Sequence, residues 1–375
     1  MTVSIRVASS PGEARIAVID EDRLLDYALW RPGAPDGVGD VHRGRVIAHV
    51  PAIAGGFVAL TDAEGFLPDS EGAKGLSAGT MLTVRVTRAA QGGKGPRLTA
   101  RLDGPTAAGP IAAGPIALLR RGPDPVTRLA ARYPRAPVLV DDAGLASALR
   151  GLGQRVSVAP RGAAILDDEV AEAIDALAQP IVELRGGARL SIWPTPALVA
   201  IDVDAAAALT GSGGPGARHE ALNRVAVAAV GEQIRLRNLS GGIVVDLAGL
   251  SPRKRSVLAP DFVTALANDP LSPKFLGFTA LGLAEIVRAR VHPPLHELLA
   301  GPLPAGLSAL RAVMAGFDQD PRALPAVRAH PGVVSALQAD PAALADFARR
   351  TGRAVTLRSD PSLPATVWVL EKDNG

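Results

Sequence analysis

The sequence contains no cysteine in its 375 residues. This absence excludes disulfide bridges, thiolate nucleophiles and zinc sites that depend on cysteine ligands. Any metal ion that these residues bind must therefore take oxygen or imidazole ligands.

Aromatic residues are also scarce, because seven Phe, three Trp and two Tyr make up only 3% of the chain. Hydrophobic residues nevertheless reach 47%, which is ample for a folded protein with a sizeable core. That core must be built mainly from Ala, Val, Leu and Ile.

The sequence has no strong excess of positive or negative charge. The 40 Lys and Arg residues against 37 Asp and Glu residues give a formal net charge of +3, and the pI is about 9.6. A basic balance this mild permits an anionic partner without requiring one.

Long hydrophobic runs are absent as well. The first residues, "MTVSIRVASSPGEARIAVID", lack the apolar stretch of a signal peptide. The longest uncharged stretch, residues 104–119, is interrupted by Gly and Pro and does not resemble a membrane span. We therefore expect a soluble, cytoplasmic protein.

The first third of the chain has the pattern of β-structure. Residues 3–7 and 14–20 alternate apolar and polar side chains around a Ser-Ser-Pro-Gly turn, which predicts a hairpin. Short strand-like runs separated by Gly, Asp and Pro then predict a small β-barrel. These runs cover residues 41–50, 56–60, 64–67, 81–88 and 97–102. The tandem "GPTAAGPIAAGPIA" that follows predicts a linker.

Strands and helices alternate after the linker. Strand-like "APVLVDD" and "RVSVA" alternate with helix-like 143–152 and 167–178, and residues 181–194 predict a hairpin. The next expected elements are a strand at 197–203, a helix at about 218–237, the strand "GGIVVDLAGL", a helix opening at "SPRKRS", a strand and a helix within 271–290, and a small α/β module at 305–375.

Two aspartates stand at the ends of apolar strands, Asp202 in "LVAID" and Asp246 in "GIVVD". Two strands joined by a crossover helix are expected to lie parallel in one sheet. Ligands of open α/β sheets collect at the carboxyl ends of such strands, so the two carboxylates are expected to converge. Mg²⁺ is often held by one or two carboxylates together with a phosphate, and a bound ion of this kind suits phosphodiester cleavage. The alternative is that each Asp only caps a helix or turn.

The order and spacing of several motifs resemble the ribonuclease E/G family. The family's nuclease core typically reads "EALVAIDVNSG", "RQLRLRDLGGLIVIDFIDM", "TPVR" and "SRFGLLEMSRQR". This chain has "PALVAIDVDAA", "EQIRLRNLSGGIVVDLAGL", "SPRK" and "TALGLAEIVRAR" in the same order. Upstream, "DVHRGRVIAHVPAIAGGFVALTDAEGFLPDSE" resembles the family's S1-type RNA-binding barrel.

The resemblance implies an α/β multidomain fold. An RNase H-like subdomain is interrupted by an S1-type OB-fold barrel, and a DNase I-like nuclease subdomain and a small C-terminal α/β domain follow. The implied boundaries are 1–37 and 137–180 for the RNase H-like part, 38–103 for the barrel, 104–136 for a linker or reduced 5′-sensor region, 181–300 for the catalytic subdomain and 301–375 for the C-terminal domain.

The resemblance also implies site residues. The family's metal-binding aspartates map onto Asp202 and Asp246, with Mg²⁺ as the cofactor. Its RNA-stacking aromatics resemble Phe57 and Phe66, and its basic contact resembles Lys94. An ordinary role in the barrel core remains open for both phenylalanines.

A basic run just after Asp246, formed by Arg253, Lys254 and Arg255, and Arg288 in the family's "SRQR" position are candidates for RNA phosphate contacts. An ordinary solvated basic surface is the alternative for these residues.

The chain departs from the family pattern at three points. Asp204 replaces the family's Asn, so an extra negative charge lies beside the expected metal ligand Asp202. This charge either disfavours ionisation of Asp202, or Asp204 serves as an auxiliary ligand. The family's zinc-linking cysteines are absent, so no zinc-linked tetramer is expected, but a monomer or dimer. The segment that senses an RNA 5′-monophosphate is reduced to residues 104–136, so we expect that 5′-end sensing is lost.

The resemblance therefore implies a Mg²⁺-dependent endoribonuclease that cleaves single-stranded RNA and leaves 5′-phosphate and 3′-hydroxyl ends. We expect Asp202 and Asp246 to be its catalytic metal ligands, with Asp204, which departs from the family, as a third catalytic residue that serves as an auxiliary ligand or orienter. The alternative is an RNA-binding protein of the same fold that cleaves weakly or not at all. A third possibility is that the barrel binds a protein or ribosomal RNA as a scaffold.

Overall fold

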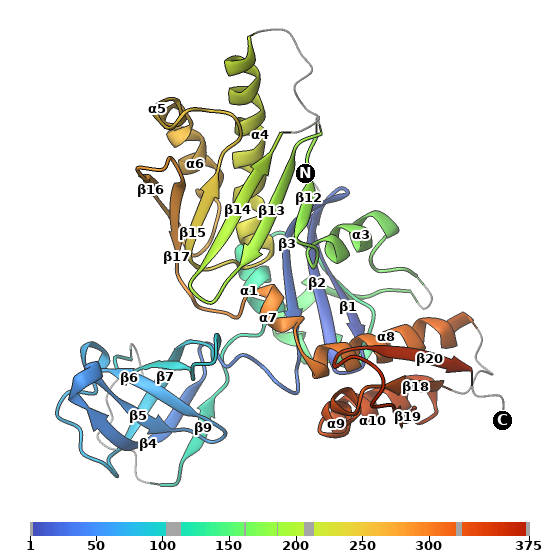
Figure 1. Cartoon of the computed structure of the whole chain (residues 1–375). Coiled ribbons are helices and arrows are strands. Elements are labelled where there is room, and N and C mark those ends of the chain that lie inside the picture. Colours follow the sequence, from blue (N-terminus) through green and yellow to red (C-terminus); the bar gives the residue numbers. More distant parts are fainter. Residues whose placement is uncertain are drawn as a thin grey trace. The chain divides into compact units, whose positions relative to one another are not determined.

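The computed structural model describes residues 3–102, 114–160, 163–185, 187–205, 214–319 and 325–372. They form a mixed α/β protein (Figure 1), and the chain divides into two compact units. Unit 1 comprises Met1–Pro35, Asp124–Gln179 and Leu298–Gly375, and unit 2 comprises Asp36–Pro123 and Pro180–Glu297. A search of the described helices for a segment both long and apolar enough to span a membrane finds none.

Unit 1 contains a five-stranded sheet in the order β11-β10-β1-β2-β3. The predicted hairpin is confirmed, because β1 and β2 pair antiparallel from Val3↔Asp20 to Ser10↔Glu13. Strands β10 and β11 continue the sheet in parallel. The elements are β1 (Val3–Ser10), β2 (Glu13–Asp20), β3 (Arg23–Trp30), α1 (Pro125–Arg132), β10 (Val138–Val140), α2 (Ala143–Ala148), β11 (Val156–Val158) and α3 (Asp168–Ala176).

The C-terminal residues of unit 1 form a smaller α/β module, as predicted. Its three-stranded sheet has the order β19-β18-β20, and Phe347 and Leu307 lie in its buried core. The elements are α8 (Pro302–Gln319), β18 (Pro325–Ala329), α9 (Pro331–Gln338), α10 (Pro341–Thr351), β19 (Thr356–Ser359) and β20 (Trp368–Lys372).

Unit 2 begins with a closed five-stranded barrel. Strand β4 pairs with both β5 and β7, and the ring closes in the order β4-β5-β6-β8-β7. The pairing of β6 with β8 is parallel, and β9 extends the sheet beside β4. The elements are β4 (Val41–Val50), β5 (Gly55–Ala59), β6 (Glu64–Pro68), β7 (Met81–Arg88), β8 (Arg97–Thr99) and β9 (Ala117–Arg120). This barrel agrees with the five predicted strand runs and is compatible with an OB-fold.

The second part of unit 2 is a six-stranded sheet in the order β12-β13-β14-β15-β17-β16. Strands β14 and β15 are parallel, joined through helix α4, and their neighbours are antiparallel. The elements are β12 (Ile181–Glu183), β13 (Arg189–Pro194), β14 (Leu198–Asp204), α4 (Pro215–Leu236), β15 (Gly241–Asp246), α5 (Pro252–Arg255), α6 (Ala259–Leu266), β16 (Lys274–Phe278), β17 (Ala284–Arg288) and α7 (Leu295–Leu298).

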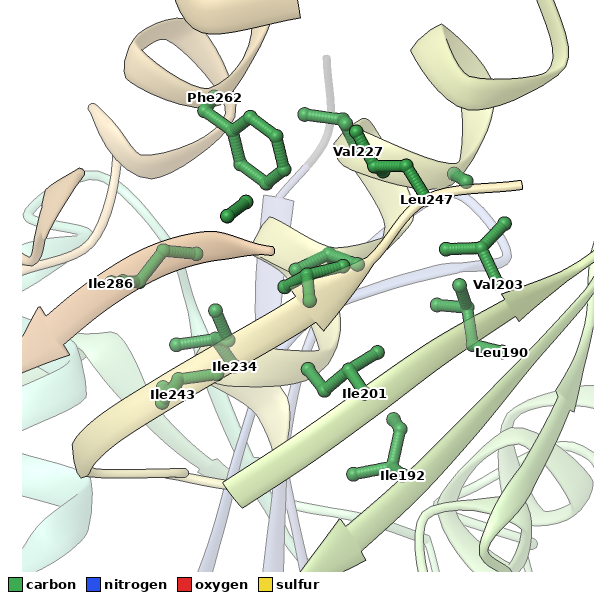
Figure 2. Close-up of a cluster of buried hydrophobic side chains, with 14 of the residues drawn as sticks. Leu190, Ile192, Ile201, Val203, Val227, Ile234, Ile243, Leu247, Phe262 and Ile286 are labelled. Carbon is green, nitrogen blue, oxygen red and sulfur yellow. The ribbon is translucent and has the colours of Figure 1, made fainter. Parts of the chain in front are cut away.

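Alternating side chains decide which face of this sheet is buried. In β14, Val199, Ile201 and Val203 are buried, whereas the residues between them are at least partly exposed. The buried side chains pack against α4 and α6, as Figure 2 shows for Val227 and Phe262. We call the opposite side of the sheet, which carries Asp202 and Asp246 and does not contribute to this core, the outer face.

Two sequence predictions need correction. The helix expected within 271–290 is wrong, because residues 284–288 form strand β17, in which Ala284, Ile286 and Arg288 point inward. The helix expected to begin at "SPRKRS" is also only partly right. Helix α5 has four residues, and the side chain of Ser251 forms no capping hydrogen bond.

The linker falls largely outside the described residues, which omit 103–113. Farther along, helix α1 lies within the predicted segment 104–136. Its Asp124 cap accepts a hydrogen bond from Thr127 N, and its Val126 and Ala130 are buried in the core of unit 1.

Candidate functional site

Asp202 and Asp246 lie side by side on the outer face of unit 2. They are direct register partners in the parallel pair β14–β15, and adjacent strands are about 4.8 Å apart. Partial burial, followed by the charges of Asp246 and Asp204, raises the pKa of Asp202 above its ordinary value. The convergence predicted from the two apolar strands is therefore present, and it produces a local surplus of negative charge.

Two of the three aspartates already have a cationic partner. Asp204 pairs with Arg189 on the neighbouring strand at 2.5 Å, which is the cross-strand partner expected from the register. Asp246 pairs with Arg255 at 2.8 Å. No lysine, arginine or histidine within the described ranges pairs with Asp202, so this carboxylate carries the uncompensated charge.

Arg255 is buried and forms an ion pair with Asp246, so it is not a free cation on the surface. Its side chain donates from Nε to Leu250 O (2.9 Å), from Nη2 to Leu247 O (2.8 Å) and from Nη1 to both Gly282 O (2.8 Å) and Asp246 Oδ1 (2.8 Å). Four of its five N–H groups are thereby used. Arg255 fixes one oxygen of Asp246, whose side chain is otherwise half exposed.

A buried asparagine supports the same loop from helix α4. Asn223 is fully buried, donates from Nδ2 to Ala248 O (2.8 Å) and accepts from Ala248 N (3.1 Å). This pair of hydrogen bonds holds the backbone that follows Asp246. The sequence signal was a polar residue within the apolar stripe of the helix, which our sequence interpretation missed.

The donor set fits a hard divalent cation that keeps most of its own water. Within the described residues there is no group of three or more His, Cys, Asp or Glu side chains able to hold a metal. Asp202 and the oxygen of Asp246 that Arg255 does not hold are the two candidate carboxylate ligands at this position, and Mg²⁺ is commonly bound by one or two carboxylates together with waters and a substrate phosphate.

The predicted basic contacts divide into two groups. Arg253 and Lys254 are exposed on α5 and remain available to an anion. Arg288 is not available to an anion, because it is only 4% exposed and forms an ion pair with buried Asp269 at 2.8 Å. The predicted RNA contact is wrong for Arg288, since its inward position on β17 makes it a structural residue.

The barrel carries an aromatic pair outside its core. Phe57 and Phe66 are register partners on β5 and β6, and their rings meet edge to face with centroids 5.8 Å apart. Neither contributes to the barrel's buried cluster, so the alternative of a core role is not supported. A Cβ at Gly55 would lie 2.5 Å from the Phe66 ring, which explains the glycine at this position.

Cationic groups accompany the aromatic pair. The Arg97 guanidinium lies 6.0 Å from the centre of the Phe66 ring, at the outer limit of cation–π attraction. Lys94 is exposed in the turn that precedes β8. Half-buried rings beside cationic side chains are typical of single-strand nucleic-acid surfaces on OB-folds, and our sequence interpretation did not identify Arg97.

Comparison with known proteins finds one family for the part of unit 2 that contains the six-stranded sheet. Residues 149–291 match the model of the ribonuclease E/G family, a range that contains β12–β17 and both aspartates. The chain is 34% identical to ribonuclease E of Nostoc sp. over 130 residues, 34% of this chain and 18% of that protein. It is 32% identical to ribonuclease G of Escherichia coli K12 over 125 residues, 33% of this chain and 25% of that protein. A ribonuclease E/G-like chloroplastic protein of Arabidopsis thaliana is 31% identical over 156 residues, 40% of this chain and 15% of that protein. The matched part thus spans a quarter or less of each of these relatives.

Proposed function

This chain belongs to the ribonuclease E/G family through residues 149–291, and on that premise we propose that it is a metal-dependent endoribonuclease acting on single-stranded RNA. The observation that supports the proposal most strongly is the register pairing of Asp202 with Asp246, beside which Asp202 has no cationic partner in the described structure.

The two carboxylates are the proposed ligands of Mg²⁺. When held there, such an ion would supply Lewis-acid chemistry, namely activation of a water molecule and polarisation of a phosphoryl oxygen. Arg255 orients Asp246 and leaves its second oxygen for the ion. Asp204 is held by Arg189, so we assign it no direct ligation and only an electrostatic influence on Asp202. The proposed products carry 5′-phosphate and 3′-hydroxyl ends.

The barrel is the proposed RNA-binding part. Phe57 and Phe66 offer ring surface for bases, and Lys94 offers a cation for the backbone. Base stacking combined with basic contacts is a sequence-tolerant way to hold a single strand. Arg253 and Lys254 are the proposed phosphate contacts nearer to the carboxylates. We further propose that the protein acts in the cytoplasm, without a zinc-linked tetramer.

A second candidate is supported by the counter-charges. Arg255 occupies one oxygen of Asp246 and Arg189 occupies Asp204, so part of the negative charge that attracts a divalent cation is already neutralised. The same fold with weak or absent cleavage, acting as an RNA-binding protein, is the function that this observation favours.

One assay distinguishes these functions. Purified protein is incubated with a fluorescently labelled single-stranded RNA, with Mg²⁺ or with EDTA, and both binding and product formation are measured. The endoribonuclease proposal predicts binding and Mg²⁺-dependent products with 5′-phosphate ends. Binding with the same affinity but no products at any Mg²⁺ concentration would favour the second candidate, and absence of RNA binding would contradict both.

A further inference from the structure

Trp193 is the one tryptophan that no hydrophobic core of the described structure uses. Trp30 and Trp368 pack against the two cores of unit 1, whereas Trp193, on β13, is 54% exposed. Its neighbours Ile192 and Leu190 point inward to the core. The ring therefore lies on the outer face, the same face as the aspartate pair.

The strand register places this ring next to the carboxylates. Trp193 is the direct partner of Ala200, and Ala200 is the direct partner of Val244. Asp202 follows Ala200 by two residues, so it is the diagonal neighbour of Trp193, at a typical spacing of about 7–8 Å that aromatic side chains can bridge. Ser191, the other near neighbour, pairs with Asp202 itself.

The surroundings of the ring leave room beside it. The side chains on the aspartate side of Trp193 are small, because Ala200 is its direct partner and Ser191 pairs with Asp202, whereas the larger Leu198 lies on the opposite diagonal, away from the aspartates. A flat indole with small residues on its aspartate side forms a shallow platform that can accept another flat ring there.

The charge on this face favours a nucleotide over a protein partner. The centres of protein interfaces are depleted of charged residues, and a protein that covered Trp193 would also have to bury Asp202 and its neighbours. A nucleotide bound at the site instead brings a phosphate, and Mg²⁺ is commonly held by carboxylates together with a phosphate. The acidic pair therefore fits the phosphate of a nucleotide, through a cation, and the exposed ring of Trp193 fits its base.

We propose that Trp193 is a substrate-positioning residue that stacks on a base of the single-stranded RNA whose phosphate lies at Asp202 and Asp246. This inference rests on the proposed function for the identity of the ligand. It assigns the β12–β17 sheet a base contact of its own, separate from the Phe57–Phe66 pair of the barrel.

Steady-state cleavage by variants of the full chain tests the proposal. Trp193→Ala is expected to raise KM roughly 5- to 100-fold, the range corresponding to loss of one aromatic stacking contact, and to change kcat little because stacking binds substrate and transition state alike. Trp193→Phe retains a ring and is expected to recover most of the loss. Val263→Ala, a 60% exposed apolar residue of α6 on the core-covering helices, is the matched control and is expected to match the unmodified protein.

Tryptophan emission provides a readout that does not depend on turnover. A short single-stranded oligoribonucleotide is mixed rapidly with the protein in Mg²⁺, and the difference between the unmodified protein and Trp193→Phe isolates the Trp193 signal. Quenching by the base-bearing oligonucleotide but not by an abasic one of equal length supports stacking. In a protein that cleaves RNA, equal KM for all variants and no difference signal would overturn this inference alone. Absence of cleavage with quenching intact would overturn the proposed reaction but not the contact.

Discussion

Replacing either Asp202 or Asp246 with asparagine is expected to lower Mg²⁺-dependent RNA cleavage about a thousandfold, which corresponds to roughly 4 kcal/mol of activation free energy. The reason is that each variant removes one of only two carboxylates available to the cation at this position of the described structure. Single-turnover cleavage at saturating protein measures the effect, and binding of the RNA by the barrel should persist.

Asp204→Asn is the matched control, because it removes a carboxylate from the same strand and face. Asp204 is paired with Arg189 at 2.5 Å, and loss of its like charge beside Asp202 should favour ionisation of the Asp202 carboxyl group. We expect an increase in cleavage of about two- to fivefold, since charges this exposed interact weakly through water. A loss as large as that of Asp202→Asn would make Asp204 a ligand and contradict our assignment of Asp202 and Asp246 as the pair.

The largest expected effect on stability belongs to Arg288. Arg288→Ala should reduce the free energy of unfolding by roughly 3–5 kcal/mol, because it leaves a buried carboxylate without its cation. Arg288 donates from Nε to Asp269 Oδ2 (2.8 Å) and from Nη1 to Asn238 Oδ1 (2.6 Å), and both members of the ion pair are almost fully buried. Urea denaturation followed by circular dichroism measures the loss.

Arg290→Ala provides the control for that experiment. Arg290 is two residues farther along but exposed, so its removal should change stability by no more than about 0.5 kcal/mol. Equal stability of Arg288→Ala and Arg290→Ala, or a loss of RNA affinity confined to Arg288→Ala with unchanged unfolding, would restore Arg288 to the RNA surface that the sequence predicted.

The sequence predicted the carboxylate pair for a physical reason that holds widely. Two apolar segments of strand length flank a helix, and strands joined in this way are usually parallel neighbours in one sheet, so Asp202 and Asp246 were expected to approach each other. The barrel strands were equally accessible, because Gly, Asp and Pro mark their ends. Both predictions depend only on local patterns and on one rule of chain connection.

The hydrogen bonds by which Arg255 holds Asp246 could not be predicted from local sequence patterns. Three of its acceptors are backbone carbonyls from two separate loops, at Leu247, Leu250 and Gly282, and no pattern in the sequence shows that these loops meet. Arg288 is a different case. The alternation of Ala284, Ile286 and Arg288 is a strand pattern with period two, and the apolar residues of the same segment were instead assigned to a helix. The RNA contact predicted for Arg288 rested on its place in the family's motif, and a strand assignment would have placed this residue on the same face as the buried Ala284 and Ile286.

The central claim is that Asp202 and Asp246 bind a divalent cation. Crystals of the full chain soaked in Mn²⁺, a hard cation that substitutes for Mg²⁺ in oxygen-ligand sites, test it through anomalous diffraction at the manganese edge. We predict an anomalous peak between the two carboxylates, with one oxygen of Asp246 still bonded to Arg255. Mn²⁺ bound elsewhere on the chain, with no peak between Asp202 and Asp246, would contradict the account.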